Sequence, residues 1–221
     1  MTDFKAARKN MVDCQIHTAG IIETLILEAF SDIPREMFVP EALQGVCYAD
    51  EAIATGGGRF LLEPIVHSRI VQALAPRKNE RVLDIGGGTG YPAAIMARLA
   101  REVVVLEDRA EFLEYAAQVW GYLGLGNIVP VKGKLTAGHE QAAPFDVIIL
   151  NGAVAEVPQI LLGQLAEGGR LAAVVKQDGR QVGQVIIYTR SAGNNISQRI
   201  LFEAGMDYLP GFEPKPAFEF N

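Results

Sequence analysis

Short apolar runs alternate with helical segments between residues 80 and 176. Five such runs occupy residues 82–85, 103–106, 128–131, 147–150 and 171–175. Strands that are apolar along their whole length and separated by helices are typical of a parallel sheet with helices on both faces. Pro130 interrupts the third run and cannot donate a ladder hydrogen bond, so we expect that strand at an edge of the sheet.

The two ends of the chain have different patterns. Apolar residues at helical spacing in residues 21–30 predict a helix that ends before Pro34. Residues 182–190 and 196–203 are β-rich and flank a polar, glycine-containing turn, which predicts an antiparallel hairpin. The proline-rich residues 210–216 predict no regular structure.

We therefore expect a mostly parallel α/β fold in one compact unit. Residues 1–75 would form a helical N-terminal cap that carries the glycine loop at residues 55–59, and residues 76–221 would form the sheet domain. Three consecutive glycines permit backbone conformations that other residues avoid. The loop is therefore either a tight turn or a wall of a site.

Composition and charge narrow the choice of partners. With 221 residues, of which 49% are hydrophobic, the chain can bury one large core. The 20 basic and 26 acidic residues give a net charge of −6, and no dense Lys/Arg block is present. A nucleic-acid partner needs several phosphate-neutralising side chains in one patch, so the charge pattern argues against one.

The cysteines and the apolar segments bear on the compartment. Cys14 and Cys47 lie in apolar neighbourhoods without CxxC spacing, which favours buried structural thiols in a reducing compartment over a disulfide or zinc site. The first residues contain no apolar leader segment, and no later run approaches the roughly 20 apolar residues of a membrane span. We therefore expect a cytoplasmic protein without a membrane partner.

A glycine turn follows the first predicted strand of the sheet. Residues 84–90 read Asp-Ile-Gly-Gly-Gly-Thr-Gly and lead into a predicted helix, at the edge of the sheet where ligands bind in open α/β folds. Tyr91 stands where the dinucleotide fingerprint needs its last glycine, which argues against NAD. Glu107 ends the next strand and can accept hydrogen bonds from ribose hydroxyls. The sequence thus predicts a nucleoside site, the alternative being a plain turn and a solvated strand end.

These residues carry a resemblance. The glycine turn with Glu107 resembles the cofactor motif of class I S-adenosylmethionine-dependent methyltransferases. Further stretches resemble protein-L-isoaspartate O-methyltransferases: Met11-Val12 with Gln15, residues 33–40, Tyr48-Ala49-Asp50, Ala143-Pro144-Phe145-Asp146 and Glu156-Val157-Pro158. The resemblance implies a doubly wound seven-stranded sheet with a reversed last strand, a helical cap over the cofactor, and carboxyl methylation of isoaspartyl residues in protein repair.

The resemblance also implies a set of site residues. The expected contacts to S-adenosyl-L-methionine are Asp84, Gly86, Gly88, Gly90, Glu107, Asp108, Lys134, Leu135, Asn151 and His67. A lone histidine on a helix, such as His67, is more often a structural residue than a cofactor contact, and Asn151 could equally orient a nucleophile or shape a turn. Lys134 stands where the family usually has an acidic contact to adenine, and a lysine cannot accept that hydrogen bond.

The expected substrate loop departs from the family pattern. Where the family reads Gln-Thr-Ile-Ser-x-Pro, this chain has Arg59, Phe60, Leu61, Leu62, Glu63 and Pro64. Phe60 and Leu62 replace two hydroxyl residues that would lie beside the methyl-transfer site, so we expect weak activity on isoaspartyl substrates. Arg59 would either pair with Glu63 or recognise a carboxylate of the substrate.

Two hypotheses about function follow. The first is a methyltransferase that acts on a protein, a peptide or another small acceptor. The second is a cofactor-binding family member that has lost catalysis or methylates a different acceptor. The sequence contains no Ser/His/Asp set and no cluster with metal-ligand spacing, so we expect no metal. It does not distinguish a monomer from a dimer.

Overall fold

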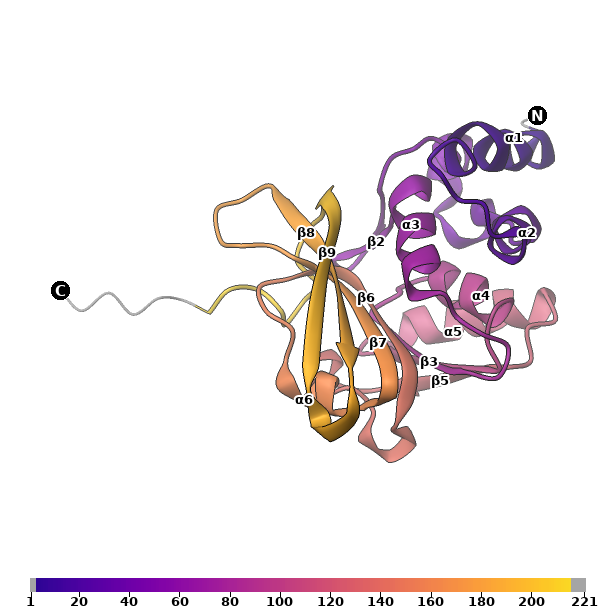
Figure 1. Ribbon diagram of the computed structural model, residues 1–221. Coiled ribbons are helices and arrows are strands. Elements are labelled where there is room, and N and C mark those ends of the chain that lie inside the picture. Colours follow the sequence, from indigo (N-terminus) through magenta and orange to yellow (C-terminus); the bar gives the residue numbers. More distant parts are fainter. Residues whose placement is uncertain (1–2, 216–221) are drawn as a thin grey trace.

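A seven-stranded sheet forms the centre of the molecule. The computed structural model describes residues 3–215, and its strands follow the order β5-β4-β3-β6-β7-β8-β9 (Figure 1). The strands are β3 (Arg81–Ile85), β4 (Glu102–Glu107), β5 (Ile128–Lys132), β6 (Phe145–Val154), β7 (Leu165–Val175), β8 (Val182–Arg190) and β9 (Ile196–Gly205). Strands β3 to β7 run parallel, and β8 and β9 form an antiparallel hairpin. The predicted mostly parallel sheet with a C-terminal hairpin is confirmed.

Two details of the strand order test the expectations further. Strand β5 lies at an edge, as Pro130 predicted, so the missing N–H of that proline costs no hydrogen bond on the outer side. The expectation of a reversed last strand is wrong, because the reversed strand is β8 and the last strand, β9, lies outside it. The short connection over residues 191–195 can only return the chain beside β8, which makes β9 the second edge.

The helices lie mainly on one face of the sheet (Figure 1). The α-helices are α1 (Phe4–Met11), which continues as η1 (Val12–Ile16), α2 (Thr24–Asp32), α3 (Pro64–Leu74), α4 (Tyr91–Ala97), α5 (Ala110–Tyr122) and α6 (Gln159–Gly163). Short turns of 3₁₀ helix are η2 (Arg35–Phe38), η3 (Glu41–Val46), η4 (Leu135–Ala137), η5 (Glu140–Ala142) and η6 (Ala192–Asn194). The helix predicted over residues 21–30 is α2, which begins at Thr24 and ends one residue before Ile33.

Successive side chains along the strands point alternately into two hydrophobic cores, one on each face of the sheet. Val82 points into the larger core, which also contains Phe30 from α2 and therefore joins the N-terminal helices to the sheet. Leu83 points to the opposite face, where Leu161 of α6 and Leu209 of the C-terminal segment cover the sheet. The larger core explains why the apolar face of α2 needs the sheet as its partner.

A two-stranded hairpin stands apart from the main sheet. Among residues 3–215, strands β1 (Ile53–Gly56) and β2 (Arg59–Leu61) pair with each other only, and Gly57 and Gly58 at the turn have positive φ values of 56° and 71°. The glycine loop at residues 55–59 therefore contains a tight turn. Along β2, side chains alternate in burial, so that Arg59 and Leu61 point inward and Phe60 stays half-buried.

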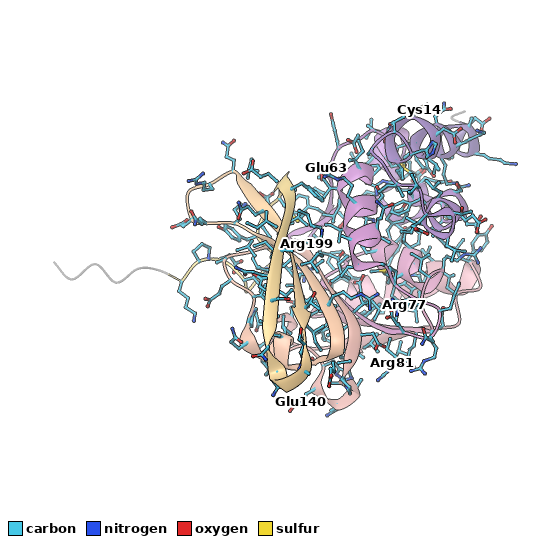
Figure 2. All side chains as sticks on the ribbon, viewed as in Figure 1. Cys14, Glu63, Arg77, Arg81, Glu140 and Arg199 are labelled. Atoms are coloured by element: carbon cyan, nitrogen blue, oxygen red, sulfur yellow. The ribbon has the colours of Figure 1, made fainter. Side chains whose placement is uncertain are left out.

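The two cysteines are unpaired, and only one is buried. Cys47 is buried and burial raises the pKa of its thiol to about 11, as expected for a structural thiol. Cys14 is exposed on η1, so the expectation that both thiols are buried is wrong (Figure 2). The turns of η1 direct Cys14 to solvent and Val12 and Ile16 to the core.

Neither a membrane span nor a metal-binding cluster occurs in the part of the chain that the structure describes. None of the helices between residues 3 and 215 combines the length and apolar character that crossing a bilayer requires. Within the same residues, no three His, Cys, Asp or Glu side chains lie close enough together to hold a metal ion.

Candidate functional site

The glycine turn lies between β3 and α4, at the carboxyl edge of the sheet. Gly86, Gly88 and Gly90 have positive φ values of 71°, 57° and 93°, which residues other than glycine rarely adopt. Trp120 donates its indole N–H to the carbonyl oxygen of Gly90 at 3.0 Å, and a Cβ at Gly90 would come within 2.5 Å of the same ring. The turn is thus fixed by α5 from outside the sheet.

Glu107 stands beside this turn at the end of β4. Its carboxylate is fully buried, and the backbone N–H of Gly88 donates to Oε2 at 3.2 Å. The N–H of Asp108 donates to Oε1 at 2.9 Å. Glu107 is therefore a positioned acceptor at the sheet edge, and the alternative of a solvated strand end is excluded.

Arg59 fills the space next to Glu107. Its Nε donates to Glu107 Oε2 at 3.0 Å and its Nη2 donates to Oε1 at 2.6 Å, a bidentate pair. Nη2 also contacts Asp108 Oδ1 at 2.8 Å. The expected pair with Glu63 is wrong, because β2 turns residue 59 inward, whereas Glu63 precedes α3 (Figure 2). Partial burial raises the pKa of the Glu63 carboxyl.

Asp84, near the end of β3, and Asn151, within β6, form a second polar pair. Asn151 Nδ2 donates to Asp84 Oδ1 and to the carbonyl oxygen of Ile85, both at 3.1 Å. Burial raises the pKa of Asp84 to about 7, with the neighbouring Glu107 charge acting in the same direction. Asp84 Oδ2 and Asn151 Oδ1 are buried and have no hydrogen-bond partner within residues 3–215. Both oxygens therefore keep an unused capacity to accept a hydrogen bond.

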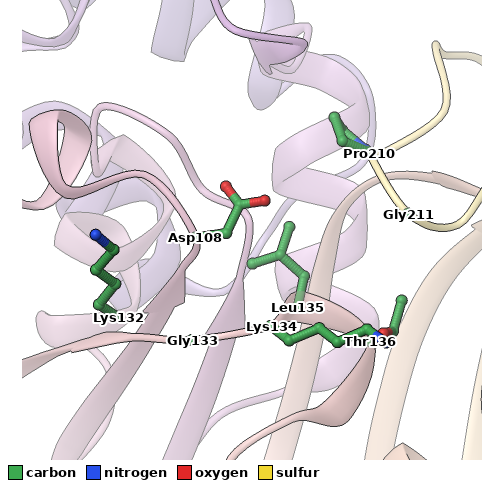
Figure 3. A pocket seen from close by; sticks show the side chains of 8 residues that line it. All are labelled: Asp108, Lys132, Gly133, Lys134, Leu135, Thr136, Pro210 and Gly211. Atoms are coloured by element: carbon green, nitrogen blue, oxygen red, sulfur yellow. The ribbon is translucent and has the colours of Figure 1, made fainter.

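A cavity of about 380 Å³ opens at the end of β4, where Asp108 follows Glu107. Its lining residues are Asp108, Lys132, Gly133, Lys134, Leu135, Thr136, Pro210 and Gly211 (Figure 3). The structure thus brings together Asp108, Lys134 and Leu135, three of the residues expected at the cofactor. Sequence reasoning missed the wall formed by Pro210 and Gly211, because an irregular proline-containing segment has no periodicity that would indicate which face it covers.

Two of the expected site residues lie in the core instead. His67 is 1% exposed and makes edge-on contacts with the rings of Phe30 and Tyr91, at centroid distances of 5.2 and 5.8 Å. Burial and the nearby Arg35 guanidinium lower the pKa of His67 to about 3. Leu62 is 2% exposed among apolar side chains, and its carbonyl oxygen accepts from Arg35 Nη2 at 2.7 Å. Neither side chain lines the cavity at the end of β4.

Comparisons with known proteins give the chain its family. The family model described as protein-L-isoaspartate(D-aspartate) O-methyltransferase matches residues 6–210. The chain is 34% identical over 203 residues to a protein-L-isoaspartate O-methyltransferase of Methanoregula boonei, covering 92% of this chain and 91% of the relative. It is 38% identical over 168 residues to the protein of the same name from Methanoculleus marisnigri, covering 76% of each.

Solved structures agree with the sequence comparisons. A protein-L-isoaspartate O-methyltransferase superposes with a TM-score of 0.80 at 26% identity, covering 92% of this chain and 66% of that one. A Plasmodium falciparum structure of the same family name, solved in complex with S-adenosyl-L-homocysteine, superposes with a TM-score of 0.75 at 20% identity and shares the fold. The match covers 95% of this chain and 99% of the Plasmodium falciparum chain. This chain belongs to the protein-L-isoaspartate O-methyltransferase family.

Proposed function

We propose that this chain is an S-adenosylmethionine-dependent methyltransferase that esterifies the carboxyl group of isoaspartyl residues in proteins or peptides. The observation that carries the proposal is the buried Glu107 carboxylate, which accepts from the Gly88 amide and directly precedes Asp108 in the wall of the cavity. A carboxylate in this position can accept hydrogen bonds from both hydroxyls of a ribose. Family membership supplies the reaction class and the substrate class.

The residues at the sheet edge fit the cofactor. Glu107 would hold the ribose, and the cavity lined by Asp108, Lys134 and Leu135 would take the adenine. The two unpartnered acceptors, Asp84 Oδ2 and Asn151 Oδ1, would accept from the ammonium group of the methionine part. An ammonium has three donors and no acceptor, which matches two oxygens without a donor of their own.

Methyl transfer to a carboxylate needs little general acid–base catalysis from the protein. S-adenosylmethionine supplies an electrophilic methyl group when it is bound. A carboxylate nucleophile is already ionised at neutral pH, so the chain contributes placement of the acceptor and exclusion of water. Half-buried Phe60, on the outward side of β2, is the loop residue that can contribute an apolar wall. Two free thiols, one of them exposed, suit a cytoplasmic location.

Two peptides of one sequence, one with an isoaspartyl and one with a normal aspartyl linkage, test the function. We expect base-labile methyl ester on the isoaspartyl peptide alone, measured as released methanol with labelled S-adenosylmethionine. Equal labelling of both peptides would contradict the assigned acceptor. If the protein binds S-adenosylhomocysteine but labels neither peptide, the proposed isoaspartyl methylation is wrong and the proposed cofactor site still stands.

Phe60→Thr should raise the isoaspartyl methylation rate by about 2- to 10-fold. The new hydroxyl can donate a hydrogen bond to the acceptor carboxylate, and one such bond contributes about 0.5–1.5 kcal/mol. Steady-state rates at saturating cofactor measure the effect, with Phe60→Val as the control that trims the ring without a hydroxyl. A Val variant as fast as the Thr variant would show that space, and not the hydroxyl, limits the rate. Leu62→Ser is unsuitable, because it places a hydroxyl in the core.

Affinity for S-adenosylhomocysteine should rise about tenfold between pH 6 and pH 8. Asp84 has a pKa of about 7 in the unliganded chain and must be ionised to pair with the ligand's ammonium group. Titration calorimetry measures the change, and 5′-methylthioadenosine, which lacks the amino-acid part, is the control ligand. Equal pH dependence for both ligands would show that Asp84 does not face the ammonium group.

A further inference from the structure

Arg59 and two backbone N–H groups together use every acceptor position of the Glu107 carboxylate. Oε1 accepts from Arg59 Nη2 and from the Asp108 N–H, and Oε2 accepts from Arg59 Nε and from the Gly88 N–H. A carboxylate offers about four lone-pair sites, two on each oxygen. No acceptor of Glu107 therefore remains for the hydroxyls of a ribose while Arg59 is in place.

The side chain of Arg59 also lies against the glycine turn. A Cβ at Gly88 would come within 2.9 Å of Arg59 Cβ and 3.2 Å of its Cγ. Arg59 itself is 1% exposed, and its guanidinium reaches as far as Asp108 at the wall of the cavity. The arginine thus covers the glycine turn as well as the carboxylate, while the cavity lined by Lys134 and Leu135 stays open next to it.

The hairpin that carries Arg59 shares no strand pairing with the seven-stranded sheet. Within the described part of the chain, strands β1 and β2 pair only with each other, and positive-φ Gly56, Gly57 and Gly58 form their turn. The turn lies over Arg109, the residue before α5, and over Pro210 of the C-terminal segment, which have the side chains nearest to Gly57 and Gly58. A displacement of this hairpin would free Glu107 and leave the hydrogen bonds of the seven-stranded sheet intact.

We propose that Arg59 is a latch that occupies the ribose carboxylate in the unliganded chain and that the cofactor must displace. This inference rests on the proposed cofactor. A ligand that binds only the open form has its apparent affinity reduced by the fraction of molecules that are open. The latch therefore sets how tightly the chain holds its cofactor, and a conformational change of the β1–β2 hairpin accompanies binding.

Binding of S-adenosylhomocysteine to three arginine variants tests the latch. Arg59→Gln keeps a hydrogen-bonding side chain but removes the charge, Arg59→Lys keeps the charge but loses the bidentate geometry, and Arg101→Gln is the matched control at an exposed site. We expect the dissociation constant to fall at least tenfold in Arg59→Gln and by less in Arg59→Lys, and to stay unchanged in Arg101→Gln. Calorimetry gives the constants, and stopped-flow fluorescence should show faster association for Arg59→Gln.

Amide hydrogen exchange supplies a second measurement that needs no affinity change. In the wild type, S-adenosylhomocysteine should speed exchange at residues 53–61, because the hairpin loses its anchor on Glu107. Equal binding by wild type and Arg59→Gln, or unaltered exchange in the hairpin of the liganded wild type, would overturn the latch and leave the proposed function standing. Weaker binding by Arg59→Gln would overturn it too, by showing that Arg59 holds the ligand. Absence of binding in all variants would overturn the cofactor assignment together with the latch.

Discussion

Replacing Glu107 by alanine should lower the free energy of unfolding by about 3–5 kcal/mol. The change removes both acceptors of the bidentate pair and leaves the Arg59 guanidinium buried, with Asp108 as its remaining carboxylate. Breaking one partner of a buried ion pair is costly mainly because the other charge stays desolvated. Urea denaturation followed by circular dichroism measures the loss at neutral pH.

Two comparisons separate the buried pair from an ordinary one. Arg81 and Glu102 form a pair at 2.8 Å whose side chains are 26% and 36% exposed, so Glu102→Ala should cost less than about 1 kcal/mol. The double variant Arg59→Met/Glu107→Leu removes both buried charges and should recover most of the stability lost in Glu107→Ala. If Glu107→Ala cost no more than Glu102→Ala, water would reach the guanidinium and the pair would not be buried.

The sheet could be predicted because its signals are local and repeated. Each strand is a short apolar run, and Pro130 indicated an edge by the hydrogen bond it cannot donate. Glu107 could be placed beside Gly88 for a similar reason, since the carboxyl ends of neighbouring parallel strands meet at one edge. Periodicity and strand order together determine these positions.

The partner of Arg59 could not be predicted from the same signals. The pairing joins residues 48 positions apart and depends on the tight turn at Gly57 and Gly58, which decides which side of β2 faces the sheet edge. Sequence proximity favoured Glu63, and geometry overruled it. The wall at Pro210 escaped prediction because irregular backbone carries no period, and the burial of His67 among aromatic rings depends on packing between α2, α3 and α4.

Asp84→Asn should stabilise the protein by about 4 kcal/mol more at pH 8 than at pH 4 relative to wild type. Burial raises the pKa of Asp84 from 3.8 to about 7. Between these values the folded chain keeps the proton that the unfolded chain releases, so the contribution of Asp84 to stability falls as pH rises. Asparagine resembles the neutral acid and removes this dependence. Urea midpoints at pH steps from 4 to 8 measure it.

His67 should change the stability of the fold with pH in the opposite direction to Asp84, over nearly the same pH range. Burial lowers the pKa of His67 from 6.5 to about 3, so the unfolded chain binds a proton that the folded chain does not. The contribution of His67 to stability is therefore complete above pH 6.5 and is lost as pH falls towards 3. Between pH 4 and 6.5 the two slopes have similar size and opposite sign, about 1.4 kcal/mol per pH unit each, and should largely cancel in the wild type.

His67→Phe separates the two contributions, because phenylalanine suits the edge-on contacts with Phe30 and Tyr91 and does not titrate. Relative to wild type, this variant should gain stability as pH falls from 6.5 to 4, whereas Asp84→Asn should gain stability as pH rises over that range. The variant with both changes should match the pH dependence of the wild type between pH 4 and 6.5. Parallel curves for wild type and either single variant would mean that the substituted side chain keeps its ordinary pKa, and that water reaches it in the folded chain.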